Sequence, residues 1–443
     1  MKVSQILFFG IFFIGISSTE AQERTSFSLE EAIHMAWTKS NEVSLANTKV
    51  NTKKYELQSV KNNQYPDFKI SGQYQRLTSA SINLQANNGS SSSTGPLPVV
   101  DQLMIGQVNA NLPIFAGFKI QNSIKVHDNL YQAETAQSLQ TKEDVALKVV
   151  NYYASLYKSQ KTVQLLKENQ KSAQQRVNDF IELEKNGIIP RNDLLKSQLQ
   201  LSKIQLSLDE ANNNLNTVNF YLTTLLKLPA ETKLEVRESD FIDFRMDNIP
   251  TDEQPALQNR KDLEAIRFQE KASLANIKMA RSAYYPSIAL IGGYTALDLK
   301  NVITVENAMN FGVGISYDLS SILKNGTMVK LAQSKALEVH NAQEILTDYI
   351  KIQVQKAIED YELALKQSVV YGQAVEQSTE NYRIVKDKYE NGLSDTNDLL
   401  EADVEQLNAT INKALAKANV IQKYYELLSV TGQLSQSFNL SKI

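Results

Sequence analysis

The feature that most constrains this chain is a ten-residue segment that occurs twice and aligns without a gap. Residues 186–195 read NGIIPRNDLL, and residues 391–400 read NGLSDTNDLL. Asn-Gly supplies the left-handed backbone conformation that ends a helix. We place the N-caps of the following helices at Asn192 and Asn397. Two such helical hairpin tips predict a chain built from two similar halves.

Long helical patterns lie on both sides of each tip. Residues 119–185 contain neither proline nor glycine, which predicts one helix on the order of 100 Å long at 1.5 Å per residue. A second long helix is expected over residues 327–390. The returning helices carry apolar residues every seven positions, as coiled-coil hairpins do. The first of these series is Leu194, Leu201, Leu208, Leu215 and Leu222.

Two strands are expected before each long helix. Helices over residues 29–63 and 261–282 end at Tyr65-Pro66 and Tyr285-Pro286, because proline disfavours helix in the residue before it. Apolar and polar residues then alternate, most clearly over residues 309–319, as in half-buried strands. A loop rich in Asn, Gly and Ser separates the first two strands (residues 87–96), and a loop over residues 298–308 separates the second two.

The order helix, strand, strand, long helix, helix thus occurs twice, in residues 22–228 and 259–443. Prolines interrupt the helical pattern over residues 229–258, which we interpret as a connector containing a short strand at 233–237. Residues 1–21 have the pattern of a secretory signal peptide: Lys2, an apolar run, and small residues before Ala21.

Composition excludes several classes of function. The formal net charge of −3 argues against a nucleic-acid-binding protein, which normally has a basic surface. The chain has no cysteine and three histidines that are far apart in sequence, so disulfides and thiolate metal sites are impossible. Gly312 and Gly314 lie within a strand pattern and lack the third glycine of a dinucleotide-binding loop. We therefore expect no enzyme, no cofactor and no metal.

Four strands cannot close a membrane barrel, because single-chain bacterial barrels have at least eight. Open strand edges are not tolerated in lipid either. The strands therefore form a sheet in water, or several chains share one barrel. Four strands from each of three chains would give a twelve-stranded barrel of porin type.

The chain resembles the outer-membrane efflux protein family, the TolC-like channel-tunnels. The motifs that carry the resemblance are LEEAI at residues 29–33, the two Tyr-Pro junctions, LPIFAG at residues 112–117, and the two tips. The second half departs from the pattern at residues 317–320, which read YDLS where the first half has the LPIFAG element.

This resemblance implies a mostly α-helical homotrimer with a membrane β-barrel portion. A twelve-stranded barrel would lie in the bacterial outer membrane and would contact outer-membrane lipid. The helices would continue from it as a tunnel through the periplasm. The tunnel would be the passive exit duct of a tripartite efflux or type I secretion system, docked on a periplasmic adaptor (membrane-fusion) protein and an inner-membrane transporter. The alternative is a periplasmic coiled-coil scaffold or adaptor without a pore, which the two strand pairs disfavour.

The resemblance also implies which residues close the periplasmic aperture of the tunnel. The matching positions are Tyr389, Asp398 and Glu401, with Asp193 as the equivalent aspartate of the first tip. Rings of carboxylates would favour cation passage. The simpler interpretation of the two aspartates is that they stabilise helix N-termini, and both roles are compatible. A basic latch residue of the family is replaced by Ser394.

The turns at the tips are the expected contact with the adaptor. They contain Gly187 and Ile188 in the first half, and Gly392 and Leu393 in the second. Glycine permits close approach of another backbone, although turn formation alone would also explain both glycines.

Overall fold

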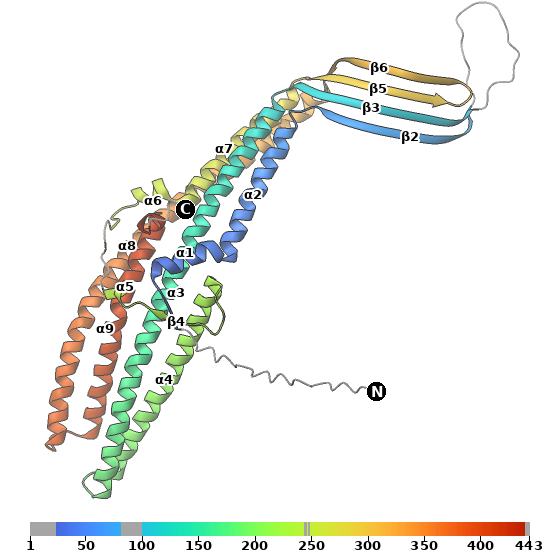
Figure 1. Cartoon of the computed structure of the whole chain (residues 1–443). Helices are drawn as coiled ribbons and strands as arrows, with labels where there is room; N and C mark the ends of the chain where they lie inside the picture. Colours follow the sequence, from blue (N-terminus) through green and yellow to red (C-terminus); the bar gives the residue numbers. More distant parts are fainter. Residues whose placement is uncertain (1–23, 81–99, 243–245, 247–248, 439–443) are drawn as a thin grey trace, which may run out of the picture.

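The computed structural model describes residues 24–80, 100–242, 246 and 249–438. A four-stranded sheet lies at one end of an elongated molecule, and two helical hairpins end at the other (Figure 1). The expected signal peptide (residues 1–21) and the Asn- and Ser-rich loop (residues 87–96) lie outside the described residues.

The order helix, strand, strand, long helix, helix occurs twice along the chain. The first series is α2 (Asn41–Asn62), β2 (Asp67–Ala80), β3 (Val100–Ala116), α3 (Lys119–Lys185) and α4 (Arg191–Leu226). The second series is α7 (Lys261–Arg281), β5 (Ser287–Leu299), β6 (Ile303–Ser316), α8 (Ser320–Glu390) and α9 (Thr396–Val430). With 67 residues in α3 and 71 in α8, each long helix spans on the order of 100 Å.

Shorter elements precede the first series, connect the two series, follow α7 within the second series, and follow α9. They are β1 (Arg24–Phe27), α1 (Leu29–Lys39), β4 (Lys233–Val236), α5 (Ser239–Ile242), α6 (Gln254–Asn259), the 3-10 turn η1 (Ser282–Tyr284) and α10 (Leu434–Ser437). The expected strand at residues 233–237 is therefore present as β4. Its partner is β1, which pairs with it in parallel and was not expected from the sequence.

The long strands form one antiparallel sheet in the order β2-β3-β5-β6. The central pair joins the two halves of the chain, because β3 belongs to the first half and β5 to the second. Within the described residues, the outer edges of β2 and β6 have no strand partner. The sheet is therefore open at both sides.

The two faces of this sheet differ in chemistry. On one face, Val108 lies opposite Ile70 and Tyr294, and Tyr294 lies opposite Met309. Ile70, Val108 and Met309 are exposed, and Phe311 on the same face is 95% exposed. The other face carries mostly polar residues in register. They include Lys69, Ser71, Gln73, Gln107, Asn109, Thr295 and Asn310.

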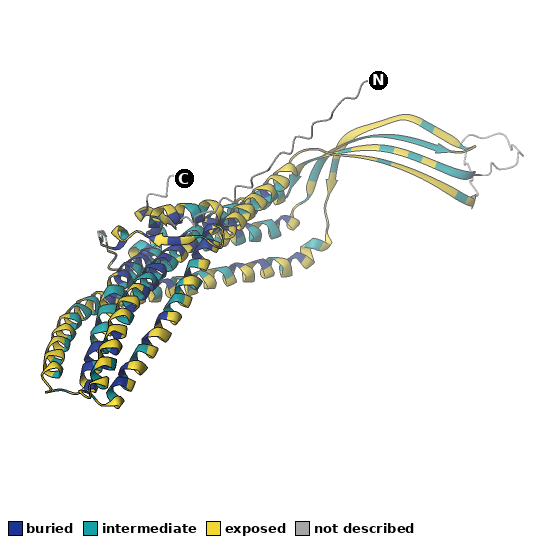
Figure 2. Ribbon diagram, turned by 60° about the horizontal axis from the view of Figure 1, so that its bottom comes forward, coloured by how far each residue is buried: buried dark blue, intermediate teal, exposed yellow. Residues whose placement is uncertain are grey.

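The main core surrounds the middle of α3. Side chains from α1, α3, α4 and α9 and from the connector bury one apolar cluster there, whereas the hairpin tips and the sheet are largely exposed (Figure 2). Ile33, Leu156 and Leu427 are among its largest fully buried residues. No helix in the described part of the chain has an apolar stretch long enough to cross a membrane.

The single helix expected over residues 29–63 is wrong, because this segment forms two helices, α1 and α2. Helix α1 begins with the expected capping box, in which the Glu31 backbone N–H donates to Ser28 Oγ (3.2 Å) and the Ser28 N–H donates to Glu31 Oε2 (2.7 Å). The helix ends at Ser40, whose extended backbone starts α2 and whose Oγ accepts from the Val43 N–H. One serine therefore ends one helix and caps the next.

The ends of the second strand pair also differ from expectation. Helix α8 begins at Ser320 rather than near residue 327, because Asp318 Oδ1 accepts from the Ser320 N–H (3.0 Å) and starts the helical turn. The strand accordingly stops at Ser316 and not at residue 319. The expected loop over residues 298–308 is only a short turn, with Asn301 in the left-handed region.

Candidate functional site: the two hairpin tips

The two tips have the same backbone hydrogen bonds. In the first, the Gly187 N–H donates to Glu184 O (2.9 Å) and the Ile188 N–H to Leu183 O (2.9 Å). In the second, the Gly392 N–H donates to Tyr389 O (3.0 Å) and the Leu393 N–H to Lys388 O (2.8 Å). This is the Schellman motif, which requires a left-handed residue after the helix. The glycines supply it, with φ of +69° and +72°.

The asparagine before each glycine caps the same helix end. Asn186 Nδ2 donates to Glu182 O (2.7 Å), and Asn391 Nδ2 donates to Asp387 O (2.8 Å). Each of these carbonyl oxygens also accepts from the backbone N–H of the same asparagine at 3.2 Å, so the side chain adds a second hydrogen bond at the helix C-terminus. The Asn-Gly pairs therefore stop α3 and α8 in the same way.

The returning helices begin two residues earlier than predicted. Pro190 and Asp395 occupy the N-cap positions, so Asn192 and Asn397 lie in the first helical turn and are not caps. In the second tip the Asp395 carboxylate accepts from the Asn397 N–H (2.7 Å) and the Asp398 N–H (3.1 Å). A carboxylate that accepts hydrogen bonds from two N–H groups of the first turn is an effective N-cap.

The three predicted aperture carboxylates lie on the first turns of α4 and α9. Asp193 Oδ1 is 3.5 Å from Lys196 Nζ. Asp398 is exposed, and its Oδ2 accepts a hydrogen bond from Ser394 Oγ at 2.7 Å. Glu401 is exposed one turn further along α9. The residue that replaces the family's basic latch thus contacts Asp398 of its own chain.

Tyr389 is placed differently from these carboxylates. Its ring stacks on Phe180 of α3, with ring centroids 6.0 Å apart, and it packs beside an apolar cluster of α3 and α4 that includes Val177 and Leu194. Tyr389 therefore holds the end of α8 against the first hairpin. The contacts among the described residues do not bring it together with Asp193, Asp398 or Glu401.

The apolar residues among the predicted adaptor contacts are exposed at the tips. Ile188 is 66% exposed and Leu393 is 77% exposed. A Cβ added at either Gly187 or Gly392 would meet no heavy atom within 4 Å. Each tip thus presents one apolar side chain beside open backbone.

One pair of residues near the tips was missed by sequence reasoning. Arg176 of α3 forms a bidentate ion pair with Asp403 of α9, at 3.0 and 3.1 Å, and its Nη2 also donates to the Tyr382 hydroxyl of α8 at 3.5 Å. The two charged side chains are only 12% and 8% exposed. Burial alone would lower the pKa of Arg176, but the hydrogen bond and charge of Asp403 raise it overall.

A signal for this pair was present in the sequence. Asp403 directly follows Ala402, which lies on the buried stripe of α9, and a carboxylate at such a position is buried only with a partner. The pairing residue could not be identified, because Arg176 is more than two hundred positions away in the chain.

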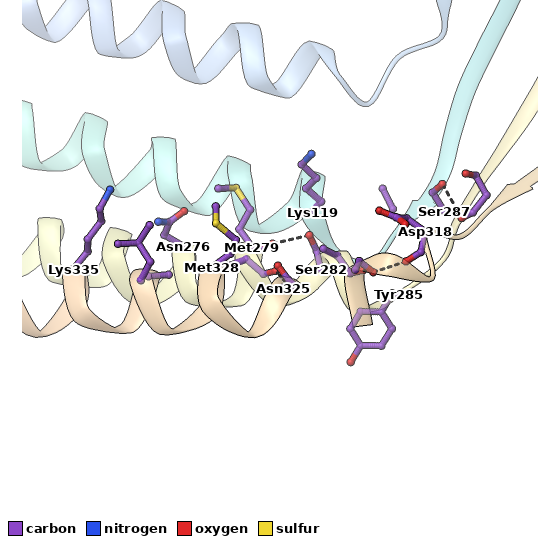
Figure 3. A pocket seen from close by; sticks show the side chains of 17 residues that line it. Lys119, Asn276, Met279, Ser282, Tyr285, Ser287, Asp318, Asn325, Met328 and Lys335 are labelled. Atoms are coloured by element: carbon purple, nitrogen blue, oxygen red, sulfur yellow. Dashed lines mark hydrogen bonds between the residues drawn. The ribbon is translucent and has the colours of Figure 1, made fainter. Parts of the chain in front are cut away.

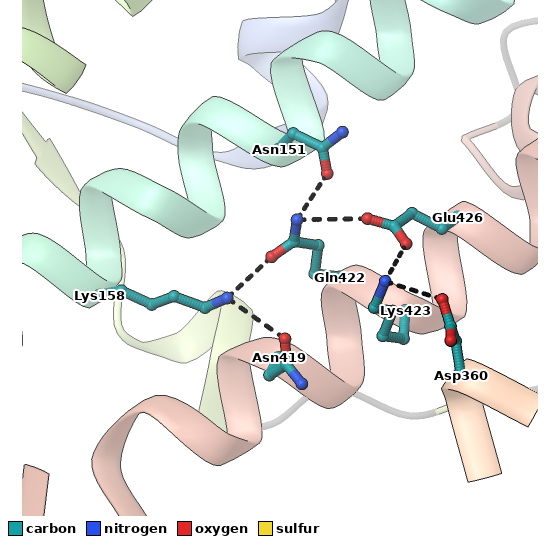
Figure 4. Close-up of polar contacts among 7 residues, drawn as sticks. All are labelled: Asn151, Lys158, Asp360, Asn419, Gln422, Lys423 and Glu426. Atoms are coloured by element: carbon teal, nitrogen blue, oxygen red, sulfur yellow. Dashed lines mark hydrogen bonds and ion pairs between the residues drawn. The ribbon is translucent and has the colours of Figure 1, made fainter. Parts of the chain in front are cut away.

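A second polar cluster joins the same three helices further from the tips (Figure 4). Lys158 Nζ of α3 donates to Gln422 Oε1 of α9 (2.8 Å), and Lys423 of α9 contacts Asp360 of α8 (3.2 Å). Burial lowers the pKa of Lys158, opposed by the charge of Glu426. Polar contacts therefore fix α9 to its neighbours at two levels.

No group of three His, Asp or Glu side chains suited to a metal ion occurs in the described part of the chain. Each tip has an exposed apolar side chain, the second tip also has exposed carboxylates, and a buried ion pair near the tips joins the two hairpins. These features suit a surface that binds a partner and an opening whose width can change.

Comparison with known families finds a match in the second half of the chain. Residues 254–433, from α6 to the turn after α9, match the family described as Outer membrane efflux protein. This match confirms the resemblance that was expected from the sequence motifs. No curated protein sequence matches the chain.

Several solved structures share this fold over nearly the whole chain. A membrane protein from Pseudomonas aeruginosa aligns with a TM-score of 0.80 at 14% identity, covering 91% of this chain and 92% of that one. The Campylobacter jejuni CmeC outer membrane channel gives 0.76 at 16% identity, with 98% and 94% covered. The open state of the Neisseria gonorrhoeae MtrE outer membrane channel gives 0.74 at 18% identity, with 92% and 89% covered.

Proposed function

We propose that this protein is the outer-membrane channel-tunnel of a tripartite efflux or type I secretion system and acts as a passive exit duct. One observation carries the proposal: an open sheet with one exposed apolar face and one polar face continues directly into helices on the order of 100 Å long. The apolar face suits lipid and the polar face suits a water-filled passage.

The open sheet is the reason to propose a homotrimer. Its four strands leave the edges of β2 and β6 without partners in the described residues, and lipid does not tolerate open edges. Three copies would close a barrel of twelve strands, each contributing four. Phe115, Phe118 and Tyr285 form an edge-to-face cluster at the base of the sheet, where an aromatic girdle would meet the membrane surface.

In this proposal residues 22–228 and 259–443 are two efflux-protein repeats, and residues 229–258 connect them outside the tunnel wall. The tips face an adaptor protein in the periplasm. Ile188 and Leu393 would insert into apolar hollows of the adaptor, while the open glycine backbones allow close approach. An inner-membrane transporter would supply the energy.

The aperture would lie between the tips of the three chains. Asp398 and Glu401 would form acidic rings there, with Asp193 from the first tip, and Tyr389 would hold α8 against the first hairpin in the closed state. Acidic rings would make the open duct selective for cations. The hydrogen bond from Ser394 to Asp398 lies within one chain, so the closed state needs no basic latch at this position.

Single-channel recording in a planar bilayer tests this proposal. The double variant Asp398→Ala with Glu401→Ala should conduct more than the parent, because the restraint on the closed aperture is lost. Its reversal potential in a salt gradient should also move toward that of an unselective pore. The matched control is Glu338→Ala with Glu344→Ala, two exposed carboxylates of α8 far from the tips.

The competing function is a periplasmic coiled-coil scaffold without a pore. The exposed apolar face of the sheet argues against it, because a protein in water rarely exposes so large an apolar surface. Detergent-dependent solubility and a trimer that resists dissociation on a gel would support the duct. A water-soluble monomer that forms no channels would refute it.

A further inference from the structure

A hollow of about 660 Å³ lies where the sheet meets the helices (Figure 3). Its wall consists of the ends of β3, β5 and β6, one side of α7 and α8, and Lys119 at the start of α3. The volume is in the range of small-molecule sites. None of the proposed aperture residues lines this hollow, so it has no part in the proposed gating.

The strand register shows on which face the hollow opens. Ala116, Ser287 and Ser316 line it and lie opposite one another across β3, β5 and β6. Their neighbours Phe115, Ile288 and Ile315 are likewise paired and belong to the apolar face, so the lining residues belong to the polar face.

The directions of the side chains agree with this placement. Lys119, Asn276 and Lys335 point to one side of the ribbon in Figure 3, and the Tyr285 ring points to the other. If the polar face lines the duct, as proposed above, the hollow is a recess in the duct wall just below the barrel.

The recess carries a net positive charge, with two lysines and one carboxylate among its lining residues. Lys119 and Lys335 line it, and neither has an ion pair or hydrogen bond within the described residues. The only carboxylate among the lining residues is Asp318, whose Oδ1 already accepts from the Ser320 N–H and Oγ. These hydrogen bonds lower the pKa of Asp318, so it carries one negative charge at neutral pH. It has no ion pair with Lys119 or Lys335 within the described residues, and the two ammonium groups outnumber it.

The floor of the recess is apolar. Met279 of α7 and Met328 and Leu331 of α8 line it, and the last two are exposed although they lie beside charged groups. Methionine is flexible and polarizable, so such a floor accommodates apolar groups of different shapes. Asn276 adds an amide between the two lysines (Figure 3).

We propose that this recess binds amphiphilic anions during their passage through the duct. The acidic head group, a carboxylate, sulfonate or phosphate, would contact Lys119 and Lys335, and the apolar body would lie on the two methionines and Leu331. The inference rests on the proposed channel function and adds a binding site for anions near the barrel, at the opposite end of the duct from the acidic rings of the proposed aperture.

Single-channel recording of the full-length protein in a planar bilayer tests this inference, with octanesulfonate as the probe. The probe should cause resolved interruptions of the current. Methanesulfonate, which lacks the apolar body, and octyltrimethylammonium, which has the opposite charge, should not. Lys119→Gln and Lys335→Gln should each shorten the interruptions by about tenfold, as expected for the loss of one hydrogen bond to a charged group.

The matched control is Lys330→Gln, because Lys330 is an exposed lysine of α8 that does not line the recess. Interruptions that are equal in the parent, the two recess variants and the control would overturn the inference and leave the channel intact. Interruptions with methanesulfonate of the same length would also overturn it. A protein that conducts no current would overturn the channel function and this inference together. No interruptions in a conducting parent channel, as when a neighbouring copy fills the recess, would overturn the inference alone.

Discussion

The buried pair of Arg176 and Asp403 should hold the two hairpins of one chain together, and its removal should show how strongly. At 3.0 Å and an effective dielectric constant of about 20, the attraction is about 5.5 kcal/mol before desolvation. The desolvation of two ions costs several kcal/mol each, so the net contribution of the intact pair is small. The loss of one partner is different, because it leaves a buried charge alone.

We therefore expect Arg176→Leu to lower the free energy of unfolding by about 3–5 kcal/mol, the usual cost of breaking a buried pair. The double variant Arg176→Leu with Asp403→Leu should recover most of this loss, because no charge stays buried. The Tyr382 hydroxyl, at 3.5 Å from Arg176, contributes little at that distance.

Two measurements check this. Denaturant unfolding of the purified protein gives the double-mutant cycle, and amide hydrogen exchange along α9 shows where protection is lost. The control is Arg383→Leu, since Arg383 is an exposed arginine of α8 that pairs with Glu380 three residues away, and exposed pairs contribute about 0–1 kcal/mol. Additive losses in the two single variants, with no recovery in the double variant, would refute the reasoning.

Three further predictions follow from the described contacts. Glu143 is 6% exposed and accepts a hydrogen bond from Ser435, and burial raises its pKa above the ordinary 4.5 despite that hydrogen bond. The folded state therefore holds the Glu143 proton more tightly than the unfolded state does. As the pH rises from 4.5 to neutrality, the free energy of unfolding should fall more in the parent than in Glu143→Gln, and denaturation at a series of pH values measures this difference. Gly187→Ala and Gly392→Ala should each cost about 1–2 kcal/mol, the strain of a left-handed residue alone, and a much larger loss in denaturant unfolding would mean that other contacts form there. Phe311→Lys should lower barrel stability by about 2–4 kcal/mol in lipid, whereas Asn310→Lys on the polar face should not; equal effects in folding assays with lipid vesicles would contradict the assignment of the faces.

The long helices, their tips and the strand pairs were predictable because each depends on a local repeating pattern. Residues 119–185 lack any helix breaker, so the bounds of α3 came out as predicted. The helix starts were less accurate. Asn192 and Asn397 are good caps in general, but Pro190 and Asp395 lie two residues earlier, and the choice between neighbouring caps depends on small energy differences.

The long-range contacts could not be predicted from the sequence. The stacking of Tyr389 on Phe180 and the pairing of Arg176 with Asp403 depend on how two hairpins lie against each other, which no local pattern encodes. The same holds for Asp398 and Glu401, because in the proposed trimer the side chains that face them belong to neighbouring chains.

The pairing of β1 with β4 has a consequence for how the protein is made. Arg24 lies opposite Lys233, and the Leu29 N–H donates to Asp240 across more than two hundred residues. A chain that emerges from its N-terminus must therefore keep β1 without a partner while the whole first hairpin is synthesised and exported. Unpaired strands invite aggregation during such a delay. Because β1 has only four residues, it offers few unpaired backbone groups to another chain, and this protects the unfinished protein from aggregation.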